Sequence, residues 1–190
     1  MQQEPIVIVS GLPRSGTSMM MKILEAGGLE VLTDNIRTAD EDNPKGYYEF
    51  ERVKKVSEDK EWLPDAVGKV VKIISALLKD LPDDYHYKIL FMRRKMEEIL
   101  ASQKQMLIRR GEPTDTVSDD KMTAVFEDHL VKVEKFMAAK PNFDVMYVSY
   151  NDVLVNPLDN IKNVNAFLDN RLDETKMSSV IDKSLHRQRR

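Results

Sequence analysis

Residues 6–18 read Ile-Val-Ile-Val-Ser-Gly-Leu-Pro-Arg-Ser-Gly-Thr-Ser, and this stretch decides the fold class. The first four residues are apolar and β-branched, which predicts a parallel strand that is buried on both faces. Residues 18–26 have apolar side chains at helical spacing and end at Gly27-Gly28. A strand, a turn with two glycines and a helix in this order form a phosphate cradle. In such a turn, backbone N–H groups point inward and the helix start adds partial positive charge.

Strand and helix signals alternate along the rest of the chain. We expect further strands at residues 29–32, 67–74, 87–92 and 144–148, and helices at residues 49–60, 96–109, 121–139 and 157–168. Asn43-Pro44-Lys45-Gly46 predicts a turn. This alternation predicts an α/β fold of three layers, like that of P-loop NTPases, with a mostly parallel central sheet flanked by helices. A length of 190 residues suits one domain that spans residues 1–190.

Composition excludes several classes of function. The net charge of −3 argues against general nucleic-acid binding, and the absence of cysteine excludes disulfides, Fe–S clusters and thiol catalysis. The histidines, His86, His129 and His186, have no metal-ligand spacing, so we expect no metal. No apolar stretch approaches the roughly 20 residues of a membrane span, and no basic start precedes a signal-like run. We therefore expect a cytoplasmic protein.

The loop resembles a Walker A motif with one residue missing. That motif requires Lys-Ser or Lys-Thr after its second glycine, whereas Thr17-Ser18 follows Gly16 here. The basic residue of the loop is Arg14, whose guanidinium can bind an oxyanion through two hydrogen bonds. The loop is therefore expected to bind phosphate, but the group transferred need not be phosphoryl.

Residues 11–18 resemble the 5′-phosphosulfate loop of the sulfotransferases that use 3′-phosphoadenylyl sulfate (PAPS), in the bacterial-type branch with Pro-Arg-Ser-Gly-Thr. The resemblance implies transfer of a sulfuryl group from PAPS to a hydroxyl or amine, with release of adenosine 3′,5′-bisphosphate (PAP) and without a metal. It assigns the donor's 5′ end to loop residues Gly11, Pro13, Arg14, Ser15, Gly16, Thr17 and Ser18. Arg14 would also neutralise charge on the leaving phosphate.

A second part of the chain fits the same family. Its members hold the 3′-phosphate with an arginine at the end of a later strand and a serine about eight residues further on. Here the strand at residues 87–92 is followed by Arg93-Arg94, and Ser102 lies eight residues after Arg94. Both arginines remain candidates, and Lys95-Met96 replaces the Asp-Pro common in the family.

Three further groups are candidates for the chemistry. Glu49, at the end of Asn-Pro-Lys-Gly-Tyr-Tyr-Glu, is the first choice for the general base, and His86 is the alternative. Lys72 lies near a strand end, where the family often has a lysine at the reaction centre. The tail arginines, Arg187, Arg189 and Arg190, either close over the 3′-phosphate or form a solvated end. Lys72 and Glu49 can also have purely structural roles. Lys72 can form an ion pair, and Glu49 can be a carboxylate that complements the dipole in the first turn of a helix.

Two other functions fit the same residues. One is a P-loop nucleotide kinase-like enzyme that uses ATP, against which the missing lysine counts. The other is a catalytically inactive sulfotransferase homologue that binds a nucleotide. If the chain is a sulfotransferase, its partner would be a small-molecule or carbohydrate acceptor. Nothing in the pattern selects one acceptor or an oligomeric state.

Overall fold

The computed structural model describes residues 4–34, 36, 46–114 and 116–181. Two features expected from the sequence lie wholly or mostly outside these residues. The tail arginines 187, 189 and 190 lie outside the described residues, as do the first three residues of the turn predicted at 43–46.

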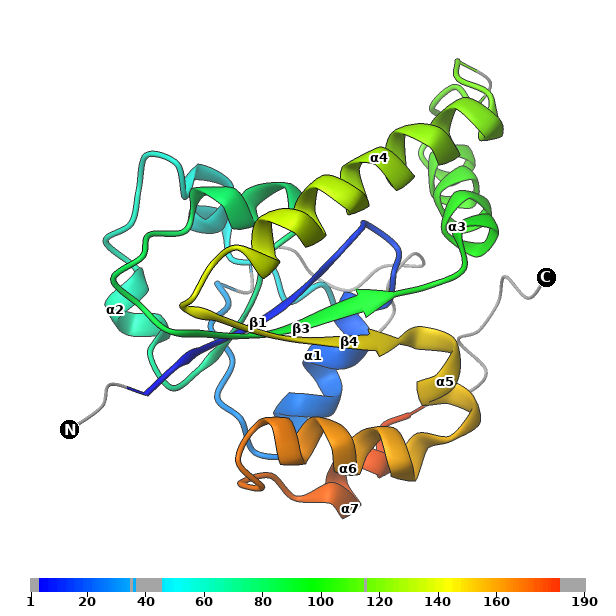
Figure 1. The fold of residues 1–190 in the computed structure, drawn as a ribbon. Coiled ribbons are helices and arrows are strands. Elements are labelled where there is room, and N and C mark those ends of the chain that lie inside the picture. The colour runs from blue at the N-terminus through cyan, green and yellow to red at the C-terminus, as the bar shows by residue number, and fades with distance from the viewer. Residues whose placement is uncertain (1–3, 35, 37–45, 115, 182–190) are drawn as a thin grey trace.

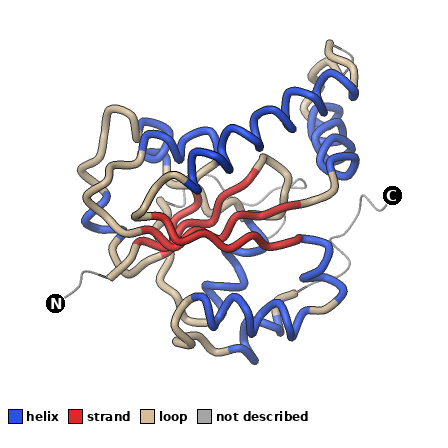
Figure 2. Tube along the Cα trace, viewed as in Figure 1, coloured by secondary structure: helices blue, strands red, loops and turns tan. Residues whose placement is uncertain are grey.

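Four parallel strands form one sheet within the described residues (Figure 2). They are β1 (Ile6–Gly11), β2 (Val70–Lys72), β3 (Tyr87–Arg93) and β4 (Phe143–Ser149), and their order across the sheet is β2-β1-β3-β4. From β1 the chain goes to β2 on one side and then to β3 on the other. The carboxyl end of β1 is therefore a topological switch point, which is where open α/β sheets bind ligands.

Helices cover both faces of the sheet, which confirms the predicted three-layer α/β architecture (Figure 1). On one side lie α1 (Thr17–Ala26), α5 (Tyr150–Val155), α6 (Pro157–Phe167) and α7 (Glu174–Ser179). The other side carries α2 (Leu63–Ala66), α4 (Asp119–Ala138) and the 3₁₀ helices η1 (Glu51–Lys55) and η2 (Ser75–Asp80). The helix α3 (Met96–Arg109) packs against α4 (Figure 1).

β1 lies in the middle of the sheet, and every one of its residues is buried. Val7 and Val9 pack in the core beneath α1, whereas Ile6 and Ile8 pack in the core beneath α4. This two-sided burial accounts for the continuous apolar run of the sequence, because a strand covered on both faces has no solvent side. Each such side chain contributes about 1.5–3 kcal/mol on burial, so β1 firmly anchors the loop that follows it.

Three expected elements are shorter or different in the structure. Residues 29–32 form no strand, and only Val31 makes an isolated bridge, to Val70. The strand expected at residues 67–74 has three residues, Val70–Lys72. The helix expected at residues 49–60 is reduced to η1, because the chain reverses after it: the N–H groups of Glu58 and Asp59 both bond to the Lys55 carbonyl.

Trp62 anchors this reversed segment in the core. Its side chain is fully buried, its ring lies 5.6 Å from that of Phe50 in an edge-on arrangement, and its indole N–H donates to the Asp59 carbonyl at 3.0 Å. The Arg52 guanidinium makes two 2.7 Å bonds to the Asp59 carboxylate, which lowers the pKa of Asp59. The segment after Glu49 is thereby fixed against the sheet.

α5 was not expected from the sequence, yet it places Tyr150 next to the loop. It begins immediately after β4, and the Ser149 hydroxyl accepts from the Asp152 N–H at 3.2 Å as its N-cap. Six residues with little periodicity make no clear helical pattern, which is why sequence reasoning missed this helix.

We expect Gly11→Ala to destabilise the protein more than Gly28→Ala does. Both glycines have positive φ, 144° and 100°, so each substitution incurs backbone strain of about 1–3 kcal/mol. Only at Gly11 would the added Cβ collide, at 2.6 Å from Ser15 Oγ and 2.7 Å from the Met92 carbonyl oxygen; nothing lies within 4 Å at Gly28. The collision adds about 1–3 kcal/mol. Urea unfolding followed by Trp62 fluorescence measures both, and equal losses would contradict the close packing at Gly11.

Candidate functional site

The loop between β1 and α1 is a tight turn held by its own atoms. Ser15 is buried, and both its N–H and its hydroxyl donate to the Leu12 carbonyl, at 3.2 Å and 2.7 Å. Arg14 and Gly16 have positive φ values of 70° and 102°. The Ser15 hydroxyl therefore shapes the turn from within. Pro13, with its restricted φ, precedes the strained Arg14.

α1 starts directly after this turn. Its N-cap is Gly16, which makes no side-chain cap bond, and its first turn has no acidic residue. The partial positive charge of the helix N-terminus is therefore not compensated by a carboxylate of that first turn. Thr17 and Ser18 are the first two residues of the helix, so both hydroxyls lie beside this end of α1.

Arg14 ties the loop to the segment after β3. Its Nε donates to the Ser102 hydroxyl of α3 at 2.9 Å, and its carbonyl accepts from Nη1 of Arg94 at 3.1 Å. The structure thus brings together the two predicted parts of the donor site, which lie 80 and 88 residues apart in sequence. These three groups meet at the carboxyl edge of the sheet, at the switch point beside β1.

The two candidate arginines lie differently. Arg94 contacts the loop, and its side chain is only 7% exposed. Arg93 pairs with Glu134 of α4, lies 4.6 Å from the centre of the Tyr147 ring, and is 45% exposed. A cavity of about 70 Å³ reaches both of them; its walls are Leu12, Ser15, Met92, Arg93, Arg94, Ile99 and Leu130. Both arginines therefore line one small cavity beside the loop.

Glu49 and Lys72 form an ion pair at the carboxyl end of β2. Lys72 Nζ lies 3.9 Å from Glu49 Oε1 and donates to the Tyr47 carbonyl, and Lys54 Nζ lies 3.8 Å from Glu49 Oε2. The Lys72 and Glu49 side chains are 11% and 20% exposed. The two candidates thus lie together, and Lys72 has the ion-pair role that the sequence left open.

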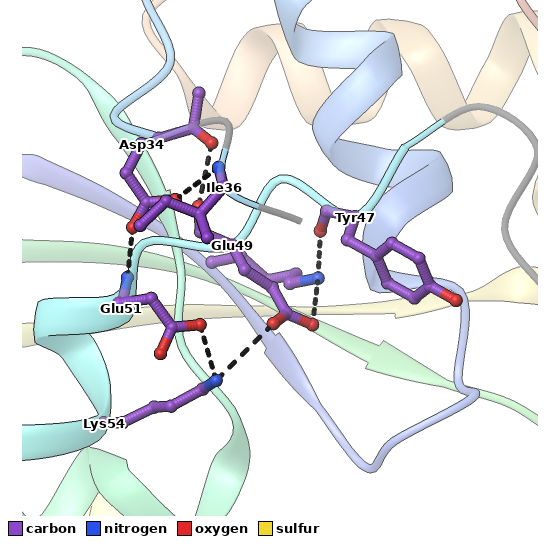
Figure 3. Close-up of polar contacts among 8 residues, drawn as sticks. Asp34, Ile36, Tyr47, Glu49, Glu51 and Lys54 are labelled. Atoms are coloured by element: carbon purple, nitrogen blue, oxygen red, sulfur yellow. Dashed lines mark hydrogen bonds and ion pairs between the residues drawn. The ribbon is translucent and has the colours of Figure 1, made fainter. Parts of the chain in front are cut away.

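The backbone around Glu49 is also tied down. Its carbonyl accepts from the Thr33 hydroxyl at 2.8 Å. The Asp34 carboxylate accepts from the Glu51 N–H at 2.6 Å (Figure 3). These bonds join the segment to the chain that follows α1, so the Glu49 carboxylate is held in place rather than carried on a loose loop.

His86 lies at the wrong edge of the sheet for a general base. It precedes β3, and its Nε2 lies 2.9 Å from the Asp144 carboxylate near the start of β4. The seven residues of β3, of which Arg93 is the last, separate it from Arg94 by roughly 20 Å. The alternative base expected from the sequence is therefore excluded by its position.

Sequence reasoning missed three residues that surround Arg94. Glu98 Oε2 accepts from Arg94 Nε at 2.8 Å, and its Oε1 accepts from Asn151 Nδ2 at 2.9 Å. The ring of Tyr150 lies 4.3 Å from the Arg94 guanidinium and covers Gly16, where a Cβ would lie 2.4 Å from Tyr150 Cδ2. Burial raises the pKa of Tyr150, while the nearby charge of Arg94 opposes the rise. The four-residue spacing of Arg94 and Glu98 was the available signal.

None of the helices in the described part of the chain is both long and apolar enough to cross a membrane. Nor do three His, Asp or Glu side chains gather there in a way that could hold a metal ion.

Several solved sulfotransferases have a similar fold. The mouse sulfotransferase SULT7A1, solved in complex with PAP, is 13% identical with a TM-score of 0.54, and the match covers 98% of this chain and 64% of that one. Sulfotransferase STF1 from Mycobacterium tuberculosis H37Rv is 15% identical with a TM-score of 0.54, covering 94% and 71%. STF9 from Mycobacterium avium is 14% identical with a TM-score of 0.53, covering 100% and 70%.

The chain thus spans slightly less than two thirds of the mouse enzyme's length. No curated protein matches the sequence. Identities this low show the shared fold alone, but the family is shown by the sequence itself. Residues 4–189 match the model of the sulfotransferase domain, so the chain belongs to the sulfotransferase domain family.

Proposed function

We propose that the protein transfers a sulfuryl group from PAPS to a hydroxyl or amine of a small-molecule or carbohydrate acceptor, with release of PAP. The observation that carries this proposal is the meeting of Arg14, Ser102 and Arg94 at the switch point of the sheet. Membership of the sulfotransferase domain family supports it. PAPS carries anionic groups at both its 5′ and 3′ positions, so its site needs two sets of donors.

The loop is the proposed site for the 5′ end of the donor. Gly11, Pro13, Ser15 and Gly16 shape the turn, while Thr17 and Ser18 offer hydroxyls beside the N-terminus of α1. In the in-line displacement, the bond from sulfur to the bridging oxygen breaks as the acceptor attacks, and negative charge develops on the departing phosphate. Arg14 would stabilise that charge, which a fixed guanidinium does well.

The 3′-phosphate is assigned to Arg93, Arg94 and Ser102. Both arginines line the 70 Å³ cavity beside the loop. Ser102 is buried, and its hydroxyl accepts from Arg14 of the loop. Arginine suits this task because its planar group can make two hydrogen bonds to one phosphate.

Glu49 is the proposed general base, and Lys72 its partner at the reaction centre. Glu49 would take the acceptor's proton as the sulfuryl group moves, and Lys72, 3.9 Å from that carboxylate, would stabilise charge on the sulfuryl oxygens. The scheme draws its positive charge from Arg14, Lys72 and Arg94 and uses no metal ion.

Arg14→Ala is expected to weaken PAP binding at least tenfold, which is about 1.4 kcal/mol, because it removes the cation of the loop. Isothermal titration with PAP and with Mg-ATP measures this, and Arg110→Ala, a charge loss at an exposed residue beyond α3, is the matched control. Wild-type protein that prefers Mg-ATP would support a kinase-like function instead. Unchanged PAP affinity in Arg14→Ala would remove Arg14 from the site.

Glu49→Gln should lower turnover by about 10²–10⁴-fold while PAP affinity stays within twofold, since a general base acts on the acceptor and not on the donor. Transfer from radiolabelled PAPS over a panel of hydroxyl and amine acceptors measures turnover. Glu51→Gln is the control, because Glu51 pairs with the same Lys54 at 2.6 Å. Loss of PAP binding in Glu49→Gln would make Glu49 structural, and a wild type that binds PAP but transfers to no acceptor would indicate an inactive homologue.

A further inference from the structure

We propose that Glu98 is a positioning residue of the donor site, which aims the Arg94 guanidinium at both the loop and the second phosphate. This rests on the proposed function, because it assumes a donor with a 3′-phosphate. Glu98 lies in neither the predicted loop nor the predicted strand end.

Burial of the pair points to a role in geometry. The Glu98 and Arg94 side chains are 1% and 7% exposed, so both charges are largely removed from water. A buried ion pair adds little stability over apolar residues of the same size, because desolvation offsets the attraction. What such a pair does supply is a fixed orientation, since turning the two groups apart would give up the Arg94–Glu98 contact without exposing either charge to water.

The geometry fixes the guanidinium at three places. Glu98 Oε2 accepts from Nε at 2.8 Å, the Arg14 carbonyl accepts from Nη1 at 3.1 Å, and the Tyr150 ring lies 4.3 Å from the central carbon. The carboxylate is fixed in turn, because its other oxygen accepts from Asn151 Nδ2 at 2.9 Å. The position of the Arg94 guanidinium therefore depends on α5, through the contacts of Asn151 with Glu98 and of Glu98 with Arg94.

One consequence concerns the loop. Arg14 is a non-glycine residue at φ 70°, a conformation that persists only where its surroundings hold it. Its carbonyl is held by Arg94 and its side chain by Ser102. Without Glu98, Arg94 would lose the partner that keeps it under the loop, and the Arg14 carbonyl would lose the support that Arg94 gives it.

The other consequence concerns the cavity. Arg94 lines the 70 Å³ space together with Ser15 of the loop. Its remaining N–H groups can serve an anion there, because a guanidinium has five donors and the contacts to Glu98 and the Arg14 carbonyl use two of them. Arg93, in contrast, forms its ion pair with Glu134 of α4, and its side chain is partly exposed to solvent. Glu98 thus selects Arg94 as the arginine that joins the loop to the second phosphate.

The test compares Glu98→Gln with Glu97→Gln, an exposed glutamate one position earlier on α3, by titration with PAP and with 5′-AMP, which lacks the 3′-phosphate. We expect Glu98→Gln to weaken PAP binding at least tenfold and to reduce the preference for PAP over AMP by fivefold or more. Glu97→Gln should change neither. A parallel loss for both ligands, or no loss, would overturn the inference, because a merely structural role leaves the preference unchanged.

Asn151→Ala provides a second variant in case Glu98→Gln does not fold. It removes the Asn151 contact from the Glu98 carboxylate and keeps both charges of the Arg94–Glu98 pair, so we expect the preference for PAP over AMP to fall by about twofold to fivefold. An unchanged preference in folded Asn151→Ala overturns the inference. Wild-type protein that fails to bind PAP overturns the proposed function, whereas wild-type binding with unchanged preference in the variants overturns this inference alone.

Discussion

The conformation of the loop after β1 depends on the two hydrogen bonds that join Arg14 to the segment after β3. The Arg14 side chain donates to Ser102, and the Arg14 carbonyl accepts from Arg94. Because Arg14 has positive φ, the backbone alone would not favour this shape. One bond reaches α3 and the other reaches the residue that follows β3, so the turn is joined both to the end of β3 and to α3.

Charge at the carboxyl edge of the sheet is balanced locally. Arg94 pairs with Glu98, Arg93 with Glu134, and Lys72 with Glu49. Each acid comes from a different element, and each cation is thereby held in a definite direction. A chain with a net charge of −3 can therefore still place several cations at one edge of the sheet, because the overall charge says nothing about the arrangement at one place.

Local patterns were sufficient for the elements with strong periodicity. The helix predicted at residues 96–109 has those bounds in the structure, and the strand predicted at residues 87–92 is one residue longer. The predictions for residues 29–32 and 49–60 were wrong, because the structure of these segments depends on contacts with residues elsewhere in the chain. Val31 forms one isolated β-bridge with Val70, and the turn after η1 is followed by the buried side chain of Trp62. Tertiary packing overrides propensity in such segments.

The sequence alone determined the loop and its place in the fold, because a buried β-branched strand followed by two spaced glycines and a helix admits few other arrangements. Only the tertiary structure decided which residues meet it. Ser102 and Arg94 reach Arg14 across 88 and 80 residues, and Tyr150 and Asn151 arrive from a helix with no sequence signal. His86 is seven residues from Arg93, yet it lies at the opposite edge, since an extended strand separates its two ends by its full length.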